Sequence, residues 1–232
     1  MGLHVTATPP HPPPAKSDQA PSTNWEVIVK QRGGPATIKF ICWVAAFAEI
    51  SLIVTQTLGY QSYTMGVLYP LGMQIRIDQP CIYGSSSVNL YPSPLFLLGT
   101  CLATTGGYIR YRCYQELGRM FTFEMTIMKE HKLVTTGPYA WVRHPAYTGV
   151  ICTISGIVMV HCASGSWLIE CKVLESTLGK GVSVIYLILT SMITTGLIKR
   201  IPKEDEALAA RFGQEWKEWT QRVPFKLFMG IY

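Results

Sequence analysis

The chain has 232 residues, of which 48% are hydrophobic and only 15% are charged, whereas a soluble domain carries roughly 25% charged residues. This composition excludes an ordinary soluble globular protein and favours an integral membrane protein. The formal net charge is +6, but the basic residues are spread between apolar segments, so a charged membrane surface is a better partner than nucleic acid. The seven cysteines show no metal-binding spacing and predict neither structural zinc nor a disulfide framework, although Cys81 and Cys171 leave room for one bridge.

Residues 1–24 are rich in proline and contain no apolar run, which predicts a disordered tail. Residues 25–93 are predicted to hold the first transmembrane span, at about 37–58, and a long loop, because about 20 helical residues cross a hydrocarbon core of roughly 30 Å. Glu49 lies in the middle of that span. Its carboxylate is predicted either to line a substrate path or to bond to a neighbouring helix.

A second span is expected at about 94–111, ending on Arg110, Arg112 and Tyr114 at the membrane interface. Residues 121–127 alternate between apolar and polar side chains, which predicts a strand paired in a hairpin with residues 132–135. Third and fourth spans follow at about 146–168 and 182–198. Four spans put both termini on one side together with most of the 20 lysines and arginines, and the positive-inside rule assigns that side to the cytosol.

The C-terminal stretch from residue 201 onward predicts an amphipathic helix. Pro202 and the acidic residues after it suit a helix start. Leu208, Phe212, Trp216 and Trp219 then recur at helical spacing, so their face is expected to lie on the bilayer or to dock on the bundle. The predicted fold is an all-α integral membrane protein with about four or more transmembrane helices, a cytosolic cofactor-binding region and this terminal helix.

The polar stretch from His131 to Gly149 concentrates histidine, arginine, proline, glycine and aromatic residues between two apolar spans. The same membrane face is predicted to hold Arg200, Glu204 and Asp205. Carboxylates that take an ammonium group and an arginine fork that takes a carboxylate suit a zwitterionic, partly apolar cofactor. The structural alternatives are anchoring of Arg143 and His144 beside lipid phosphates, and charge complementarity at a helix start.

Two separated motifs carry a family resemblance. They are His131-Xaa-Leu-Val-Thr-Xaa-Gly-Pro-Tyr with Arg143-His144-Pro145-Xaa-Tyr147-Xaa-Gly149, and Arg200-Ile201-Xaa-Xaa-Glu204-Asp205-Xaa-Xaa-Leu208 with Phe212-Gly213. Over residues 94–232 the chain resembles the membrane-embedded isoprenylcysteine carboxyl methyltransferase family. It departs from the family pattern in Asp205, where glutamate is usual, and in Trp216 and Trp219, where tyrosines are usual.

The resemblance implies methyl transfer from S-adenosylmethionine to the C-terminal carboxylate of a prenylated cysteine at the endoplasmic reticulum membrane, with residues 94–232 as the methyltransferase core. The implied partners are the lipid bilayer and either prenylated protein C-termini or prenylcysteine small molecules. The expected catalytic residues are Arg143, His144 and Glu204. The expected substrate-binding residues are Arg143, Arg200, Glu49 and Trp216, and the expected cofactor-binding residues are His131, Leu133, Val134, Gly137, Pro138, Tyr139, His144, Pro145, Tyr147, Glu204 and Asp205.

Several alternatives remain open at this point. Phospholipid amine methyltransferases share the Arg-His-Pro region and the acidic pair, and their ammonium substrates need a base such as His131 or His144. A lipophilic small acid, such as a terpenoid, would suit the same pocket. The residues after Trp219 also resemble the C-terminus of NADPH-dependent membrane sterol reductases, and a scaffold that has lost activity would keep the same fold.

Overall fold

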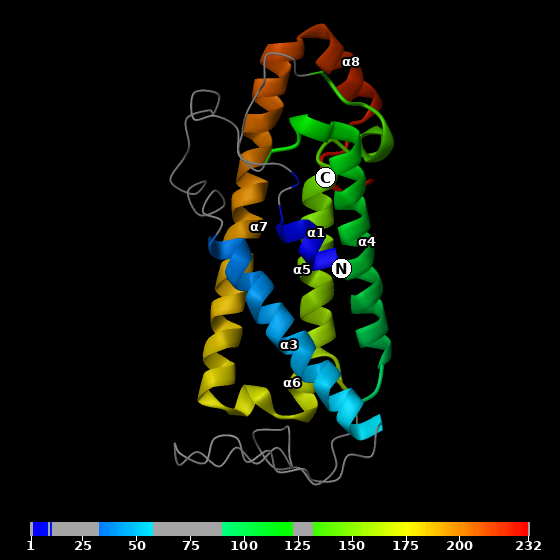
Figure 1. Cartoon of the computed structure of the whole chain (residues 1–232). Coiled ribbons are helices and arrows are strands. Elements are labelled where there is room, and N and C mark those ends of the chain that lie inside the picture. The colour runs from blue at the N-terminus through cyan, green and yellow to red at the C-terminus, as the bar shows by residue number, and fades with distance from the viewer. Residues whose placement is uncertain (1, 9, 11–32, 58–89, 123–131, 232) are drawn as a thin grey trace.

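The structure is a computed structural model that describes residues 2–8, 10, 33–57, 90–122 and 132–231. These residues form helices and irregular segments, with no strand among them (Figure 1). Three candidate membrane spans cover Gly33–Val54, Pro145–Glu170 and Thr177–Phe212. They fall on α3 (Gly33–Thr57), on α5 (Pro145–Cys162) with α6 (Trp167–Glu170), and on α7 (Thr177–Phe212). The all-α membrane fold is therefore confirmed.

The expected second span corresponds to α4 (Pro94–Leu117), a helix that packs along α5. It is not among the three helices that are apolar enough to cross a membrane by composition. Small residues bring the two backbones together: a Cβ placed on Gly106 would lie 2.6 Å from the Gly149 carbonyl oxygen, and one on Gly99 would lie 2.7 Å from that of Gly156. Small residues drive helix association in membranes, so close pairing with α5 holds α4 in the bundle.

The predicted hairpin is wrong in its described parts. Residues 121–122 and 132–135 form no strand, and residues 123–131 lie outside the described ranges. Phe121 is buried and makes an edge contact with Tyr114, with ring centroids 4.4 Å apart. Leu133 and Val134 pack against the same hydrophobic cluster. The short helices η3 (Gly118–Met120) and η4 (Gly137–Ala140) flank this region, so side-chain packing takes the place of backbone pairing.

The predicted disordered tail is also wrong for its first residues, while residues 11–24 lie outside the described ranges. Gly2–Ala7 form a short helix, α1, which lies across the middle of the bundle in contact with α3, α4 and α5 (Figure 1). Thr6 is buried there. Gly2 approaches Ala103 and Gly107 so closely that a Cβ on Gly2 would lie 2.6 Å from the Ala103 carbonyl oxygen. Small residues on both sides make this docking possible.

α7 runs for 36 residues, or about 54 Å, which exceeds a hydrocarbon core of roughly 30 Å. The predicted helix start at Pro202 is wrong, because the helix continues through this proline to Phe212. The chain turns at Gly213, whose φ of 53° suits glycine, and α8 (Gln214–Arg222) follows. Trp216 and Trp219 are buried in one cluster, against which Leu208 and Phe212 also pack. The aromatic stripe therefore docks on the protein.

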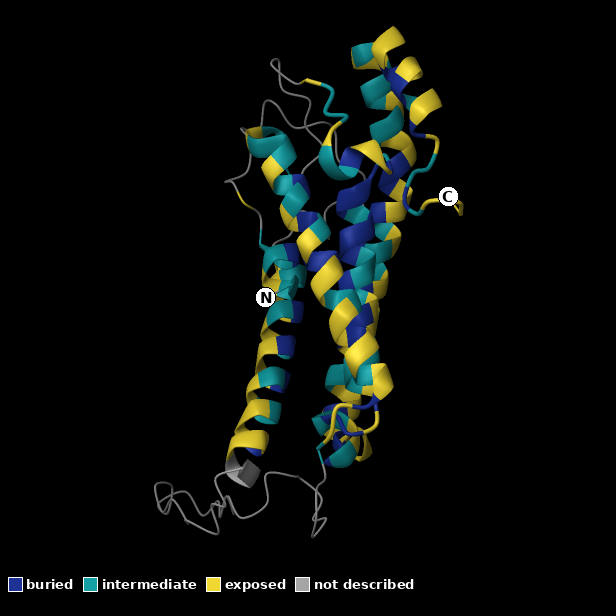
Figure 2. Cartoon of the chain, turned by 90° about the vertical axis from the view of Figure 1, so that its right-hand side faces the viewer, coloured by how far each residue is buried: buried dark blue, intermediate teal, exposed yellow. Residues whose placement is uncertain are grey.

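The buried residues gather in the half of the bundle nearest α8 and the C-terminus, while exposed residues cover the outer surfaces of the long helices (Figure 2). At the opposite end, α6 and η5 (Val173–Glu175) link α5 to α7. Glu49 lies at that end, where its Oε1 accepts a hydrogen bond of 3.1 Å from the Trp167 backbone N–H. Cys171 nearby is disulfide-bonded, in agreement with the single bridge that the sequence left open for it, and Cys81 lies outside the described residues.

Candidate functional site

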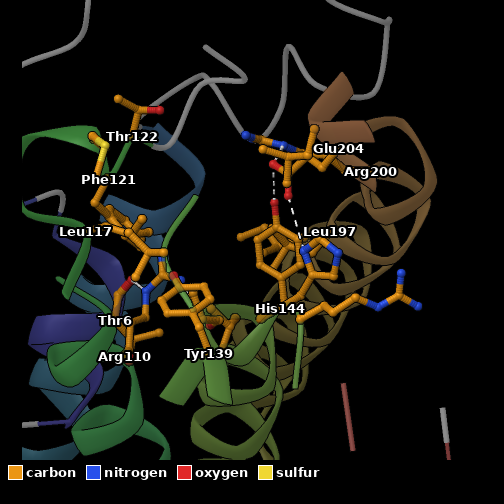
Figure 3. A pocket seen from close by; sticks show the side chains of 18 of the residues that line it. Thr6, Arg110, Leu117, Phe121, Thr122, Tyr139, His144, Leu197, Arg200 and Glu204 are labelled. Carbon is orange, nitrogen blue, oxygen red and sulfur yellow. Dashed lines mark hydrogen bonds and ion pairs between the residues drawn. The ribbon is translucent and has the colours of Figure 1, made fainter. Parts of the chain in front are cut away.

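A cavity of about 220 Å³ lies where α1, α3, α4, α5 and α7 meet. His144, Arg200 and Glu204 form one wall, and Thr6, Arg110 and Phe121 lie on the facing wall (Figure 3). Apolar side chains from all five of these helices line the space between them. The cavity is thus polar on two sides and apolar between them, which suits a ligand with a charged head and an apolar body.

Glu204 is the centre of the first wall. Its Oε1 accepts hydrogen bonds from Arg200 Nε at 2.6 Å and from the Tyr147 hydroxyl at 2.7 Å. Its Oε2 faces His144 Nδ1 at 3.4 Å. Arg200 and Glu204 share a face of α7 because residues four apart in a helix are neighbours. The carboxylate is therefore fixed by three side chains and still borders the cavity.

Asp205 lies behind this wall and does not line the cavity. Its Oδ2 accepts from Arg143 NH1 at 3.0 Å, and its Oδ1 lies 2.8 Å from His144 Nε2. The His144 ring consequently bridges the two carboxylates, and it also stacks on Tyr147 with centroids 5.6 Å apart. Arg143 borders the cavity, and its buried Nε has no hydrogen-bond partner among the described residues.

The surroundings of His144 and Tyr139 fix their protonation. Burial disfavours the charged His144 ring, but the hydrogen bonds and negative charges of Asp205 and Glu204 outweigh burial and raise the pKa of His144 above its ordinary value. Burial is also the main reason that the pKa of Tyr139 lies well above its ordinary value. At neutral pH Tyr139 keeps its hydroxyl proton, and His144 favours the imidazolium form more than an exposed histidine does.

The C-terminal segment, residues 224–227, positions the motif around Arg143 and His144. The backbone N–H groups of Arg143 and His144 donate to the Phe225 and Lys226 carbonyl oxygens at 2.9 and 2.8 Å. Arg143 NH2 donates to the Pro224 carbonyl at 3.2 Å. Backbone partners far apart in sequence leave no pattern in the chain, which is why sequence reasoning missed this support.

Of the residues predicted for the site, eight line the cavity: Leu133, Val134, Tyr139, Arg143, His144, Tyr147, Arg200 and Glu204. Gly137, Pro138, Pro145, Trp216 and Glu49 do not line it, and His131 lies outside the described residues. Gly137 has a φ of 58°, and a Cβ there would lie 2.5 Å from Glu116 Oε1, so its position is a packing requirement. Within the described ranges no group of three His, Cys, Asp or Glu side chains is arranged to hold a metal ion.

Sequence reasoning also missed the facing wall. Arg110 is 5% exposed, so its predicted role as an interface anchor is wrong. Its Nε donates to the Thr6 carbonyl at 3.1 Å and its NH1 donates to the Ala146 carbonyl at 3.1 Å. A charged residue within a membrane-embedded helix is by itself a sign of function, and that signal was available at Arg110. Nothing in the sequence indicated that α1 would border the cavity.

Comparison with known proteins places this geometry in a family. The model of the isoprenylcysteine carboxyl methyltransferase (ICMT) family matches residues 97–210, which include His144, Arg200 and Glu204 of the first wall and Arg110 and Phe121 of the facing wall, but not α1. About half of the chain therefore matches this family. The probable protein-S-isoprenylcysteine O-methyltransferase of Oryza sativa subsp. indica is 30% identical over 128 residues, which are 54% of this chain and 57% of the relative.

Two further relatives carry similar names. Protein-S-isoprenylcysteine O-methyltransferase B of Arabidopsis thaliana is 30% identical over 128 residues, covering 54% of this chain and 55% of the relative. Protein-S-isoprenylcysteine O-methyltransferase of Schizosaccharomyces pombe is 24% identical over 208 residues, covering 80% of each chain. The chain thus spans little more than half the length of the plant relatives that it matches, and the fission yeast relative is matched over a larger share.

Proposed function

We propose that this protein transfers a methyl group from S-adenosylmethionine to the C-terminal carboxylate of a prenylated cysteine. The family match over residues 97–210 and the names of the relatives support this activity. The observation that carries the proposal is the cavity in which a fixed carboxylate, Glu204, and a guanidinium, Arg143, border an apolar space.

The residues of the first wall fit the methyl donor. Glu204 is placed to take the donor's ammonium group, because an ammonium forms a strong charge-assisted bond with a carboxylate. Arg143 is placed to take a carboxylate, of the donor or of the substrate, through its planar fork. Asp205 then acts as a positioning residue, since it holds Arg143 and His144 without reaching the cavity. The bound donor supplies an electrophilic methyl group.

The reaction needs no general base. A C-terminal carboxylate, with a pKa of about 3.5, is already ionised at neutral pH, so its oxygen forms the new bond to the methyl carbon while the departing sulfur keeps the electron pair. The chain's own residues therefore align the reactants and exclude competing water. The buried Tyr139 and the apolar lining suit that exclusion.

The structure gives a specific argument against an amine substrate. An ammonium substrate must first lose a proton, and His144 lies in the cavity wall. Both of its ring nitrogens face carboxylates, and the raised pKa favours a His144 ring that already holds its proton, so less of the neutral form is present to act as a base. A carboxylate substrate is consequently the better match, whether it is a prenylated protein, a prenylcysteine or another lipophilic acid.

We further propose that the cavity faces the cytosol and that the protein is a multi-pass protein of the endoplasmic reticulum membrane with both termini cytosolic. The disulfide-bonded Cys171 directly follows α6, beyond the C-terminal end of α5, whereas His144 directly precedes the first residue of α5. Disulfides persist in oxidising compartments such as the reticulum lumen. The distribution of basic residues, taken from the sequence, supports the same orientation.

Two measurements test the function. Purified protein should transfer a radiolabelled methyl group from S-adenosylmethionine to N-acetyl-S-farnesylcysteine, and not to an otherwise identical amide that lacks the carboxylate. S-adenosylhomocysteine should raise the melting temperature, because a ligand that binds only the folded state stabilises it, and NADPH should leave the melting temperature unchanged. Stabilisation by NADPH alone, or methylation of an amine lipid alone, would contradict the proposal.

A further inference from the structure

We propose that α1 is a wall of the isoprenoid-binding part of the cavity and that Leu3 limits the length of the isoprenoid that the cavity accepts. This inference rests on the proposed function, because it names the part of the substrate that the apolar half of the cavity receives. It assigns a role in substrate specificity to α1, which belongs to the stretch that the sequence predicts to be a disordered tail.

The apolar half of the cavity is built by four helices. Leu3 of α1, Ile38 of α3, Val150 and Ile154 of α5, and Ile193 and Leu197 of α7 all line it. These side chains also pack together in one hydrophobic cluster. Leu3, Thr6 and Ala7 share one face of α1, as residues three and four apart do in a helix, and all three border the cavity.

Polar contacts fix α1 in this position. Arg110 Nε donates to the Thr6 carbonyl at 3.1 Å, and the Tyr114 hydroxyl donates to the Val5 carbonyl at 2.7 Å. The Thr6 and Thr153 hydroxyl oxygens lie 3.2 Å apart in a buried hydrogen bond. These contacts join α1 to both α4 and α5, so the helix is a fixed part of the bundle.

A close backbone contact with α4 also holds α1 in position. Gly107 lies against Gly2 so closely that a Cβ on Gly107 would overlap the Gly2 Cα. The closeness depends on having no side chain at either position. α1 therefore approaches α4 as far as two glycines allow, and this fixed helix carries the side chain of Leu3 into the lining of the cavity.

A wall of this kind selects substrates by length. In an apolar pocket, a single methylene too many or too few changes the specificity constant by roughly 10-fold or more. Shortening Leu3 opens space next to Ile38 and Val150, and enlarging it closes that space. The farnesyl and geranylgeranyl groups differ by one isoprene unit, so the ratio of their kcat/KM values reports this space directly.

The experiment compares kcat/KM for N-acetyl-S-geranylgeranylcysteine and N-acetyl-S-farnesylcysteine in the full chain. Leu3→Ala, which removes three carbons, should raise the geranylgeranyl-to-farnesyl ratio by about 10-fold or more, and Leu3→Phe should lower it by a similar factor. Gly107→Ala, which pushes α1 from the α4 side, should shift the ratio without touching Leu3. His4→Ala is the matched control, because His4 is exposed on the same helix, and its ratio should equal that of the wild type.

The outcomes separate the two proposals. If the wild type methylates neither compound, the proposed function fails, and the same variants are then compared by the shift in melting temperature that each prenylcysteine produces. If the wild type methylates both compounds and the ratio is the same in Leu3→Ala, Leu3→Phe and wild type, the role of α1 is refuted while the function stands. Leu3→Val is the milder variant to use if Leu3→Ala lowers the yield of folded protein.

Discussion

The replacement of Glu204 by glutamine is the sharpest test of the cofactor wall. Both hydrogen bonds that Arg200 and Tyr147 donate go to one oxygen, Oε1, and the amide oxygen of glutamine can accept both. The amide nitrogen then stands where Oε2 faced His144 Nδ1, and it can donate to that nitrogen in the neutral ring, in which Nε2–H still donates to Asp205. The variant should therefore fold with its neighbours in place, while the negative charge at the cavity wall disappears.

The size of the effect follows from what Glu204 would bind. A hydrogen bond to a charged group contributes about 1.5–3 kcal/mol, and each 1.4 kcal/mol is roughly a tenfold change in affinity. Glu204→Gln should consequently weaken S-adenosylhomocysteine binding by about 10- to 150-fold. Asp205→Asn should weaken it less, because Asp205 acts only through Arg143 and His144.

Isothermal titration calorimetry with S-adenosylhomocysteine on both variants in the same detergent measures this difference. Far-ultraviolet circular dichroism provides the control that each variant retains the helical fold. Wild-type affinity in Glu204→Gln, or a larger loss in Asp205→Asn than in Glu204→Gln, would refute the assignment of the ammonium group to Glu204.

Three further predictions concern the supports of the site. In Arg143→Lys the single ammonium group cannot donate to Asp205 and to the Pro224 carbonyl as the two guanidinium nitrogens do, so kcat/KM should fall by about 100-fold with little change in melting temperature. Near-normal turnover would show that the planar guanidinium of Arg143 is dispensable. The pKa of His144 is raised in the folded protein, so protonation of His144 stabilises the fold fully below its unfolded pKa of about 6.5, and this stabilisation is lost as the pH rises through the folded pKa. Melting temperatures measured from acid to mildly alkaline pH should show this decline. In His144→Gln the part of the decline that is due to His144 should be absent. Gly106→Ala should lower stability by roughly 1–3 kcal/mol in thermal unfolding, because its Cβ would meet the Gly149 carbonyl, whereas Gly181→Ala, with open space around it, should not.

The motif residues show how far sequence reasoning reaches. Arg143, His144, Tyr147 and Glu204 were chosen for their chemistry, and all four border the cavity. Leu133 and Val134 do so as well. The sequence alone does not decide whether Glu49 lines a substrate path or bonds to a neighbouring helix, because it shows the depth of Glu49 in the span but not its hydrogen-bond partner. The structure provides that partner, the backbone N–H of Trp167.

The errors have a common cause. The alternation around Phe121 is typical of a strand, yet Phe121 packs on Tyr114 because a tertiary cluster offers its side chain more contact. Pro202 predicts a helix start, but α7 continues through it. In both cases a local sequence pattern did not decide the structure: Phe121 packs in a cluster that includes Trp216 and Trp219, and Pro202 lies inside a continuous helix.

The sequence by itself determined that this is a helical membrane protein, because apolar composition and span length follow directly from the residues, and it located the two polar motifs. Only the tertiary structure decided which members of those motifs meet. Glu204 borders the cavity while Asp205 lies behind it, since one residue along a helix turns the side chain by about 100°. The place of α1 beside Arg110 was likewise beyond the sequence, because it depends on close contacts between residues more than 100 positions apart.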